Sequence, residues 1–122
     1  MFQTMSKEQR AKNISILFER QTAGIEQLTA MLQSRYGRKI ADGVLDQLEA
    51  MQGQISRHFS ELLGQDKYSP SVRYEIKKLL SGQIENLKTL RLAVEADPAK
   101  VKMIGKWLFN NSLQLKGLSG LF

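Results

Sequence analysis

Apolar residues recur along most of the chain at spacings of three, four and seven, the spacing of one face of an α-helix. A stripe over residues 14–32 is followed by stripes over residues 40–62 and 72–94, and a fourth begins at residue 101. Gln21 and Thr22 interrupt the first stripe. No stretch alternates with a period of two, so the sequence predicts no strand. The pattern therefore predicts an all-α protein.

Capping residues, glycine and proline separate the stripes. Residues 6–9, SKEQ, have the form of a capping box, with a hydroxyl at the N-cap and a glutamine three residues later. Ser69-Pro70 and Asp97-Pro98 each place a capping side chain before a proline, which fits the first turn of a helix. Gly37 and Gly64 follow the first two stripes, where a helix commonly ends on glycine.

These signals predict one domain, residues 1–122, folded as a small antiparallel bundle of four helices. The expected helices span residues 6–36, 39–63, 70–96 and 98–116, with a shorter, basic and apolar last helix and an apolar C-terminal tail over residues 117–122. The structural alternative is a long coiled-coil hairpin that completes its bundle only by dimerising.

Composition limits the class of function. The 122 residues are 42% hydrophobic and 25% charged, and none is cysteine. The chain is too apolar to be disordered, and it has no thiol for a disulfide, a metal or a nucleophile. No run approaches the roughly 18 apolar residues of a membrane span, and the start lacks the form of a secretory signal. We therefore expect a cytoplasmic protein.

The motifs that usually indicate catalysis are missing. His58 is the only histidine, and its place at the edge of an apolar stripe favours a partly buried structural residue over a catalytic base. Asp42, Asp46 and Glu49 line one helix face, where a solvated acidic surface is favoured over a cation site because no Glu-x-x-His partner occurs. No Gly-rich phosphate loop is found. We expect a protein that is not an enzyme and binds no metal or cofactor.

Positive charge gathers at the C-terminal end. The formal net charge is +6, and residues 98–122 hold four lysines and no acidic residue. The same segment is rich in tryptophan, leucine and phenylalanine. Such a segment suits an acidic protein surface, a nucleic acid or an anionic membrane.

On a helical wheel that advances about 100° per residue, the last predicted helix has two apolar arcs. The first arc faces the bundle and contains Val101, Ile104, Trp107, Leu108, Asn111, Leu115 and Leu118. The second arc lies on the other side and contains Phe109 and Leu113 together with Lys102, Lys106 and Lys116. A helix with two apolar faces is either enclosed in a core or shared between two partners.

The last residues are expected to leave the helix. Gly117 and Gly120 disfavour continued helix beyond Lys116. The apolar residues Leu118, Leu121 and Phe122 would then anchor an irregular tail, either folded back on the domain or inserted into a neighbour.

These observations predict a protein–protein interaction module, acting as an adaptor, accessory subunit, chaperone or inhibitor. It would bind a protein with an acidic surface, or a second copy of itself, through the basic and apolar C-terminal segment. The expected interface residues are Lys102, Lys106, Phe109, Leu113, Lys116, Leu118, Leu121 and Phe122. In the simpler interpretation the tail closes the domain's own core. A membrane-surface role is disfavoured, since the bulk of the apolar positions serve the bundle.

The alternative function is an accessory nucleic-acid-binding protein. Arg35, Arg38 and Lys39 form the densest basic cluster, at a helix–helix turn that suits a phosphate. Lys77, Lys78 and Lys88 would extend the contact. Three glutamates share the helix of these lysines, and no recognition helix or stacking platform is recognisable, which weakens this alternative.

Overall fold

The structure, a computed structural model, describes residues 6–32, 37–64 and 68–120. Its helices are α1 (Lys7–Leu32), α2 (Gly37–Leu63), α3 (Pro70–Ala96) and α4 (Val101–Ser119), with a short 3-10 turn, η1 (Pro98–Lys100), ahead of α4. No strand occurs within these described residues, and the expected all-α fold is confirmed.

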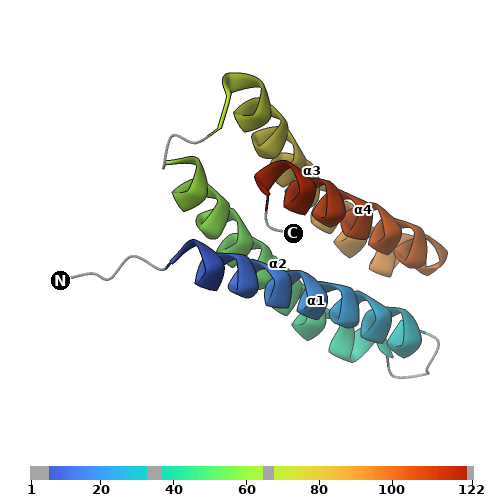
Figure 1. Ribbon diagram of the computed structural model, residues 1–122. Helices are drawn as coiled ribbons and strands as arrows, with labels where there is room; N and C mark the ends of the chain where they lie inside the picture. The colour runs from blue at the N-terminus through green and yellow to red at the C-terminus, as the bar shows by residue number, and fades with distance from the viewer. Residues whose placement is uncertain (1–5, 33–36, 65–67, 121–122) are drawn as a thin grey trace.

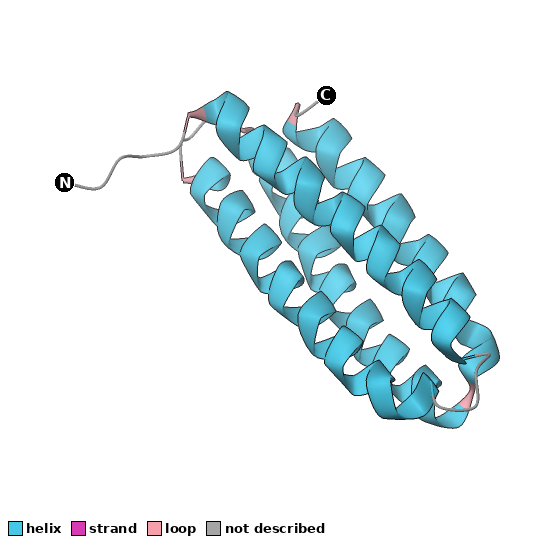
Figure 2. Ribbon diagram, turned by 90° about the horizontal axis from the view of Figure 1, so that it is seen from below, coloured by secondary structure: helices cyan, strands magenta, loops and turns pink. Residues whose placement is uncertain are grey.

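The helices pack as two hairpins that close into one antiparallel bundle. α1 lies beside α2 and α3 beside α4 (Figure 1), and the hairpins meet where α2 packs on α3 and α1 packs on α4. Figure 2 shows the four helices running along one common direction. α1 begins and α4 ends at the same end of the bundle (Figure 1). In the described part of the chain, none of these helices has the length and sustained hydropathy that a bilayer crossing requires.

Two of the three capping signals act as the sequence predicts. The Gln9 amide donates to Ser6 Oγ at 3.1 Å, and the Val72 amide donates to Ser69 Oγ at 3.3 Å. Asp97 makes no side-chain capping bond, and the proline after it opens η1 rather than α4. α4 therefore begins at Val101, three residues later than expected.

The C-terminal end of α4 corrects the predicted tail. The helix continues through Gly117 and Leu118 to Ser119, and Gly120, with φ of 69°, is its left-handed C-cap. A glycine inside a helix costs only about 1 kcal/mol relative to alanine, and burial of Ser119 and part of Leu118 offsets this cost. The Tyr68 hydroxyl also donates to the Ser119 carbonyl at 3.0 Å, and burial raises the pKa of this phenol.

The core consists of two apolar clusters. The cluster nearer the end of the bundle that carries η1, the loop-end cluster, includes Ile25, Leu28, Leu45, Leu48, Leu87, Leu90, Ile104 and Leu108. The cluster nearer the start of α1 and the end of α4, the terminal cluster, includes Ile14, Phe18, Ile55, Phe59, Leu62, Ile76, Leu80 and Leu115. Each fully buried side chain of this size contributes roughly 1.5–3 kcal/mol of transfer free energy.

Buried polar side chains separate the two clusters. Each helix supplies one of them, and we name the set Gln21, Gln52, Gln83 and Ser112 the polar layer. On every helix the polar residue lies between the residues of the loop-end cluster and those of the terminal cluster. Gln21 Nε2 donates to Gln52 Oε1 at 3.0 Å, and Gln83 Nε2 donates to Ser112 Oγ at 3.1 Å.

The polar layer is only partly satisfied by protein groups. Gln21 Oε1, Gln52 Nε2 and Gln83 Oε1 are buried, and no hydrogen-bond partner for them lies within the described residues. A buried polar group without a partner destabilises the folded state. A shift of any one helix against its hairpin partner would also break the side-chain bond between them. The layer therefore favours one register within each hairpin.

Replacing Gln52 by leucine should lower the free energy of unfolding by about 1–3 kcal/mol, because Gln21 loses its buried acceptor. Replacing both Gln21 and Gln52 by leucine should cost less than either single change, since both partners become apolar. Urea denaturation of the wild type, both single variants and the double variant measures the interaction free energy between the two glutamine side chains. Additive losses would show that the two amides do not interact.

Candidate functional site

α4 carries large apolar side chains that the bundle leaves partly uncovered. The exposed fractions of Met103, Trp107, Phe109 and Leu113 are 42%, 44%, 47% and 43%. The buried side of α4 is narrow and consists of Val101, Ile104, Leu108, Ser112, Leu115 and Ser119. These buried residues span about 80° of a helical wheel, so most of the circumference of α4 lies outside the core.

The exposed residues form two flanks. Phe109 and Leu113, the groove flank, lie on the side of α4 toward α1. Met103 and Trp107, the Trp flank, lie on the opposite side, since Trp107 and Phe109 point about 160° apart on the wheel. Phe109 and Leu113 are outside the core, as the wheel predicts. That they form an interface stays a prediction.

The position of Trp107 corrects an expectation. The wheel groups Trp107 with the core, yet its side chain is 44% exposed. Trp107 lies about 60° beyond the edge of the buried arc, which is narrower than the arc assumed from sequence. The small side chains of Ser112 and Ser119 take inward positions that no apolar stripe marks. Trp107 is therefore a surface residue.

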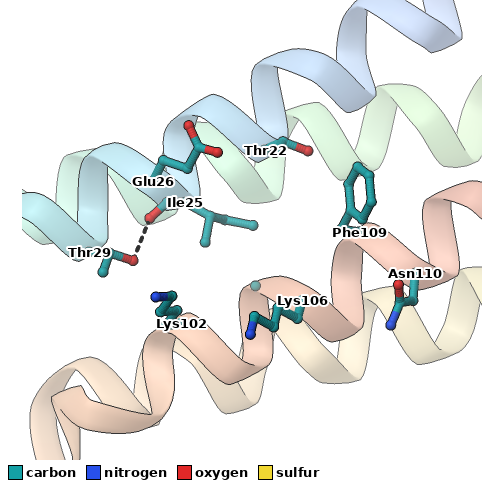
Figure 3. A pocket seen from close by; sticks show the side chains of 9 residues that line it. Thr22, Ile25, Glu26, Thr29, Lys102, Lys106, Phe109 and Asn110 are labelled. Carbon is teal, nitrogen blue, oxygen red and sulfur yellow. Dashed lines mark hydrogen bonds between the residues drawn. The ribbon is translucent and has the colours of Figure 1, made fainter.

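The groove flank faces two hollows between α1 and α4. The larger has a volume of about 390 Å³ and is lined by Thr22, Ile25, Glu26, Thr29, Lys102, Gly105, Lys106, Phe109 and Asn110 (Figure 3). The smaller has a volume of about 250 Å³ and lies toward Ser15, Glu19, Leu113 and Lys116. Phe109 lines both hollows, and Figure 3 shows its ring standing between α4 and α1. We name the two hollows together the α1–α4 groove.

Gly105 sets the separation of α1 and α4 at the larger hollow. A Cβ atom on Gly105 would lie 2.6 Å from Ile25 Cγ2, closer than carbon atoms can approach without movement. Ile25 is buried and β-branched, so its χ1 angle has little freedom to move the methyl group away. The glycine therefore permits the contact that brings the two hairpins together at this level.

The lysines of α4 give the surface its charge. The sequence of α4 contains Lys102, Lys106 and Lys116 and no acidic residue. Lys102 and Lys106 are exposed, and no carboxylate pairs with them in residues 6–32, 37–64 and 68–120. Lys116 is half-buried at the smaller hollow. Lys102 lies in the first turn, where the helix dipole disfavours positive charge.

Some predicted site residues lie elsewhere or cannot be placed. Leu118 is half-buried against the terminal cluster and is part of α4, so it is not a tail anchor. Arg35, Leu121 and Phe122 lie outside the described residues. The side chains of Arg38 and Lys39 are also outside them, although both residues belong to the first turn of α2.

The basic residues of the nucleic-acid alternative do not meet in one place. Arg38 and Lys39 begin α2, whereas Lys77 and Lys78 belong to the early part of the antiparallel α3, toward the other end of the bundle. At the rise of an α-helix this places the two pairs about 30 Å apart. Along the bundle axis, Lys88 lies between the two pairs, and its Nζ lies 3.4 Å from Glu85 Oε1.

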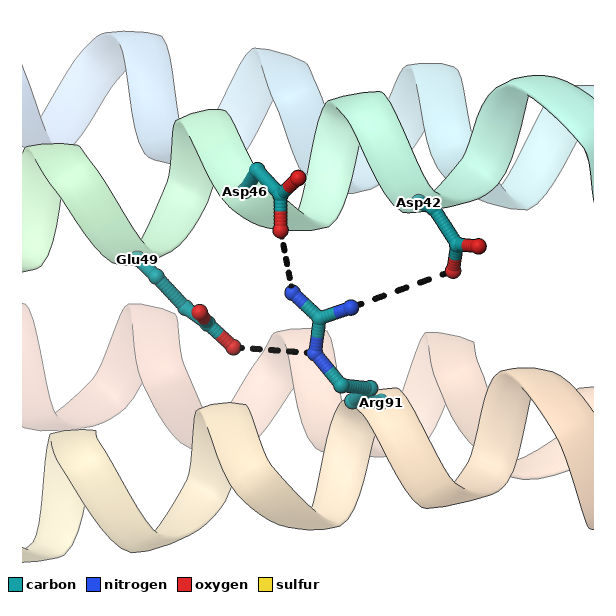
Figure 4. A network of polar contacts seen from close by, with 4 residues as sticks. All are labelled: Asp42, Asp46, Glu49 and Arg91. Carbon is teal, nitrogen blue, oxygen red and sulfur yellow. Dashed lines mark hydrogen bonds and ion pairs between the residues drawn. The ribbon is translucent and has the colours of Figure 1, made fainter.

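The acidic face of α2 is bridged by an arginine, which the sequence did not predict. Arg91 Nη2 donates to Asp46 Oδ1 at 2.7 Å, Arg91 Nε donates to Glu49 Oε1 at 3.0 Å, and Arg91 Nη1 lies 3.8 Å from Asp42 Oδ1 (Figure 4). The hydrogen bonds to Glu49 and then Asp46 raise the pKa of Arg91. The acidic face is exposed to solvent, as the sequence predicts, and a single cation of α3 offsets part of its charge. No cluster of His, Asp and Glu suited to a metal is found in the described residues.

Two further residues with ionisable side chains lie outside the groove. His58 is half-buried, as its place on the stripe predicts, and its Nδ1 is enclosed without a hydrogen-bond partner among the described residues. Arg10 is 1% exposed, and its Nη2 lies 2.6 Å from Glu61 Oε2. Both contribute to the packing of the first hairpin, and neither borders the groove.

No family model, curated protein or solved structure shows a significant match to this chain.

Substituting alanine at two glycines should test how closely α1 and α4 approach. Gly53→Ala should raise the free energy of unfolding by about 1 kcal/mol, because helix propensity improves and no atom lies within 4 Å of the new Cβ. Gly105→Ala gains the same propensity but must displace Ile25, so it should be about 1–3 kcal/mol less stable than Gly53→Ala.

Denaturant unfolding gives both values, and in an Ile25→Ala background Gly105→Ala should stabilise the protein as Gly53→Ala does, because the methyl group that its Cβ meets is absent. A Gly105→Ala protein as stabilised as Gly53→Ala would contradict the close contact.

Proposed function

We propose that this protein is a non-enzymatic helical interaction module that binds another polypeptide through the exposed side of α4. The observation that carries the proposal is the combination on one helix of half-exposed Met103, Trp107, Phe109 and Leu113 with lysines that lack acidic neighbours on that helix. Tryptophan, phenylalanine and methionine are enriched at protein–protein interfaces. Apolar residues ringed by charge are a common form of such a contact.

The available free energy supports binding of moderate strength. Full burial of a large apolar side chain is worth about 1.5–3 kcal/mol, so covering the two half-exposed side chains of one flank would contribute about 1.5–3 kcal/mol and covering both flanks about 3–6 kcal/mol. Lost translational and side-chain freedom opposes this gain. Charge complementarity at Lys102 and Lys106 would then add specificity and speed of association. An acidic partner therefore fits the surface better than a neutral one.

In this proposal the protein acts in the cytoplasm as an adaptor, accessory subunit, chaperone or inhibitor. The absence of cysteine agrees with a reducing compartment. A second copy of the chain is the second candidate partner, because it would cover the same four apolar side chains. The lysines of two α4 helices would repel one another in such a dimer, so raised salt should strengthen it.

A photo-crosslinking amino acid at position 109 should join the protein to a second polypeptide in the cells that produce it. The same amino acid at Tyr74, exposed on α3, is the matched control and should give no specific product. Lys102→Glu with Lys106→Glu should reduce the adduct at position 109, because an acidic partner is then repelled.

The mass of the adduct identifies the partner class: twice the chain mass indicates self-association, and a nuclease-sensitive adduct indicates nucleic acid. Equal labelling at positions 109 and 74, or none at either, would contradict the proposed function.

A further inference from the structure

We infer that the α1–α4 groove is a docking site for an amphipathic helix of another protein, with an acidic flank that lies along α4. This inference rests on the proposed function and names the chemistry of the partner and its place on the bundle. The groove, the charges on its two walls and the position of Phe109 each constrain the occupant.

The groove has the length of a short helix. It follows α4 from Lys102 to Lys116, which is about 21 Å at the helical rise. A docked helix of about four turns would match this length. Both walls are helices, and no sheet edge to which an extended peptide could add a strand exists in the described residues. Laying an amphipathic helix into an apolar groove is the recognition mode that such walls allow.

Phe109 divides the groove and sets the spacing of the partner's apolar side chains. One hollow lies toward Ile25 and Gly105, and the other lies toward Phe18 and Leu113. Their centres are roughly one to two helical turns apart along α4. An apolar residue of the partner would enter each hollow, so the two should be four to seven residues apart. The exposed part of Phe109 would then be covered between them.

The two walls of the groove carry opposite charge. Lys102, Lys106 and Lys116 line it from α4, whereas Glu19 and Glu26 line it from α1. A helix lying between them is complementary when its carboxylates face α4 and its basic or neutral residues face α1. A carboxylate near Lys102 would also meet the amino-terminal end of the α4 dipole, which favours negative charge.

A second copy of this chain is a poor occupant. The acidic face that a second copy could present to the groove is the row of carboxylates on α2. Arg91 already binds two of them, Asp46 and Glu49, and lies near the third, Asp42. Transfer of α2 into the groove of another copy would break those contacts and uncover the bundle core. Contact between two α4 helices would oppose lysines to lysines. The acidic flank therefore comes from a different protein.

A designed helical peptide tests this inference directly. The probe has one leucine face, glutamate along one flank, lysine along the other and no aromatic residue. The control peptide has lysine along both flanks. Fluorescence anisotropy of the labelled probe should show binding to the wild-type protein, weakened by salt. The control should bind at least about tenfold more weakly, because its lysines face those of α4.

Two matched variants locate the binding flank. Phe109→Glu and Met103→Glu make the same charge change on α4 at residues of similar exposure, 47% and 42%, and circular dichroism checks that both remain helical. Phe109→Glu should lower the affinity of the protein for the probe by about tenfold or more. Met103→Glu should leave this affinity within about twofold of the wild-type value. The emission of Trp107, on the opposite flank, should not shift when the probe binds.

Failure of the probe to bind the wild type at millimolar concentration would overturn the groove assignment. Loss of binding in Met103→Glu but not in Phe109→Glu would also overturn it, while leaving α4 as a polypeptide-binding helix and the proposed function intact. A wild type that sediments as a dimer, with Phe109→Glu monomeric and no probe present, would assign the groove to a second copy and contradict the inference.

Discussion

The hydrogen-bonded layer of Gln21, Gln52, Gln83 and Ser112 fixes how the two helices of each hairpin align. Leucine-rich cores tolerate sliding, because one apolar contact resembles the next, whereas an amide displaced by one turn, about 5.4 Å, would meet apolar side chains. Losing such a buried bond costs about 1–3 kcal/mol. In the second hairpin, the contact of Tyr68 with the end of α4 depends on this register.

The same layer shows that the bundle is built from two hairpins. Its two side-chain bonds join α1 to α2 and α3 to α4, and neither crosses between hairpins. The hairpins meet through the Arg91 contacts on one side and through Ile25 and Gly105 on the other. On the second side the contact at Gly105 is close, but hollows remain along the rest of the seam. α4 therefore buries a narrow arc and leaves both flanks in contact with solvent.

The sequence predicts the helices well because stripe spacing and capping depend on neighbouring residues. Ser69 caps α3 as expected, whereas Asp97 leads into a 3-10 turn. The sequence Asp-Pro is the same whether the next residues begin an α-helix or a 3-10 turn, so the local motif does not distinguish the two. The exposure of Phe109 follows from the wheel, but that of Trp107 does not, since the width of the buried arc depends on how closely α3 and α1 approach α4. Arg91 and the polar layer were missed because both arise from pairing between helices. The break in the first stripe at Gln21 was the one local sign of the layer.

α4 presents an accessible, basic and apolar surface in the isolated protein. Trp107 is the only tryptophan, so its fluorescence reports on α4 alone. The most direct test is quenching of Trp107 emission in the folded protein at low concentration, by iodide and by caesium. We expect the emission of a solvent-exposed indole that both ions quench, because the Trp107 side chain is 44% exposed. An emission typical of a buried indole, resistant to both quenchers, would show that this side of α4 is covered in the isolated protein and would contradict the exposed α4 surface.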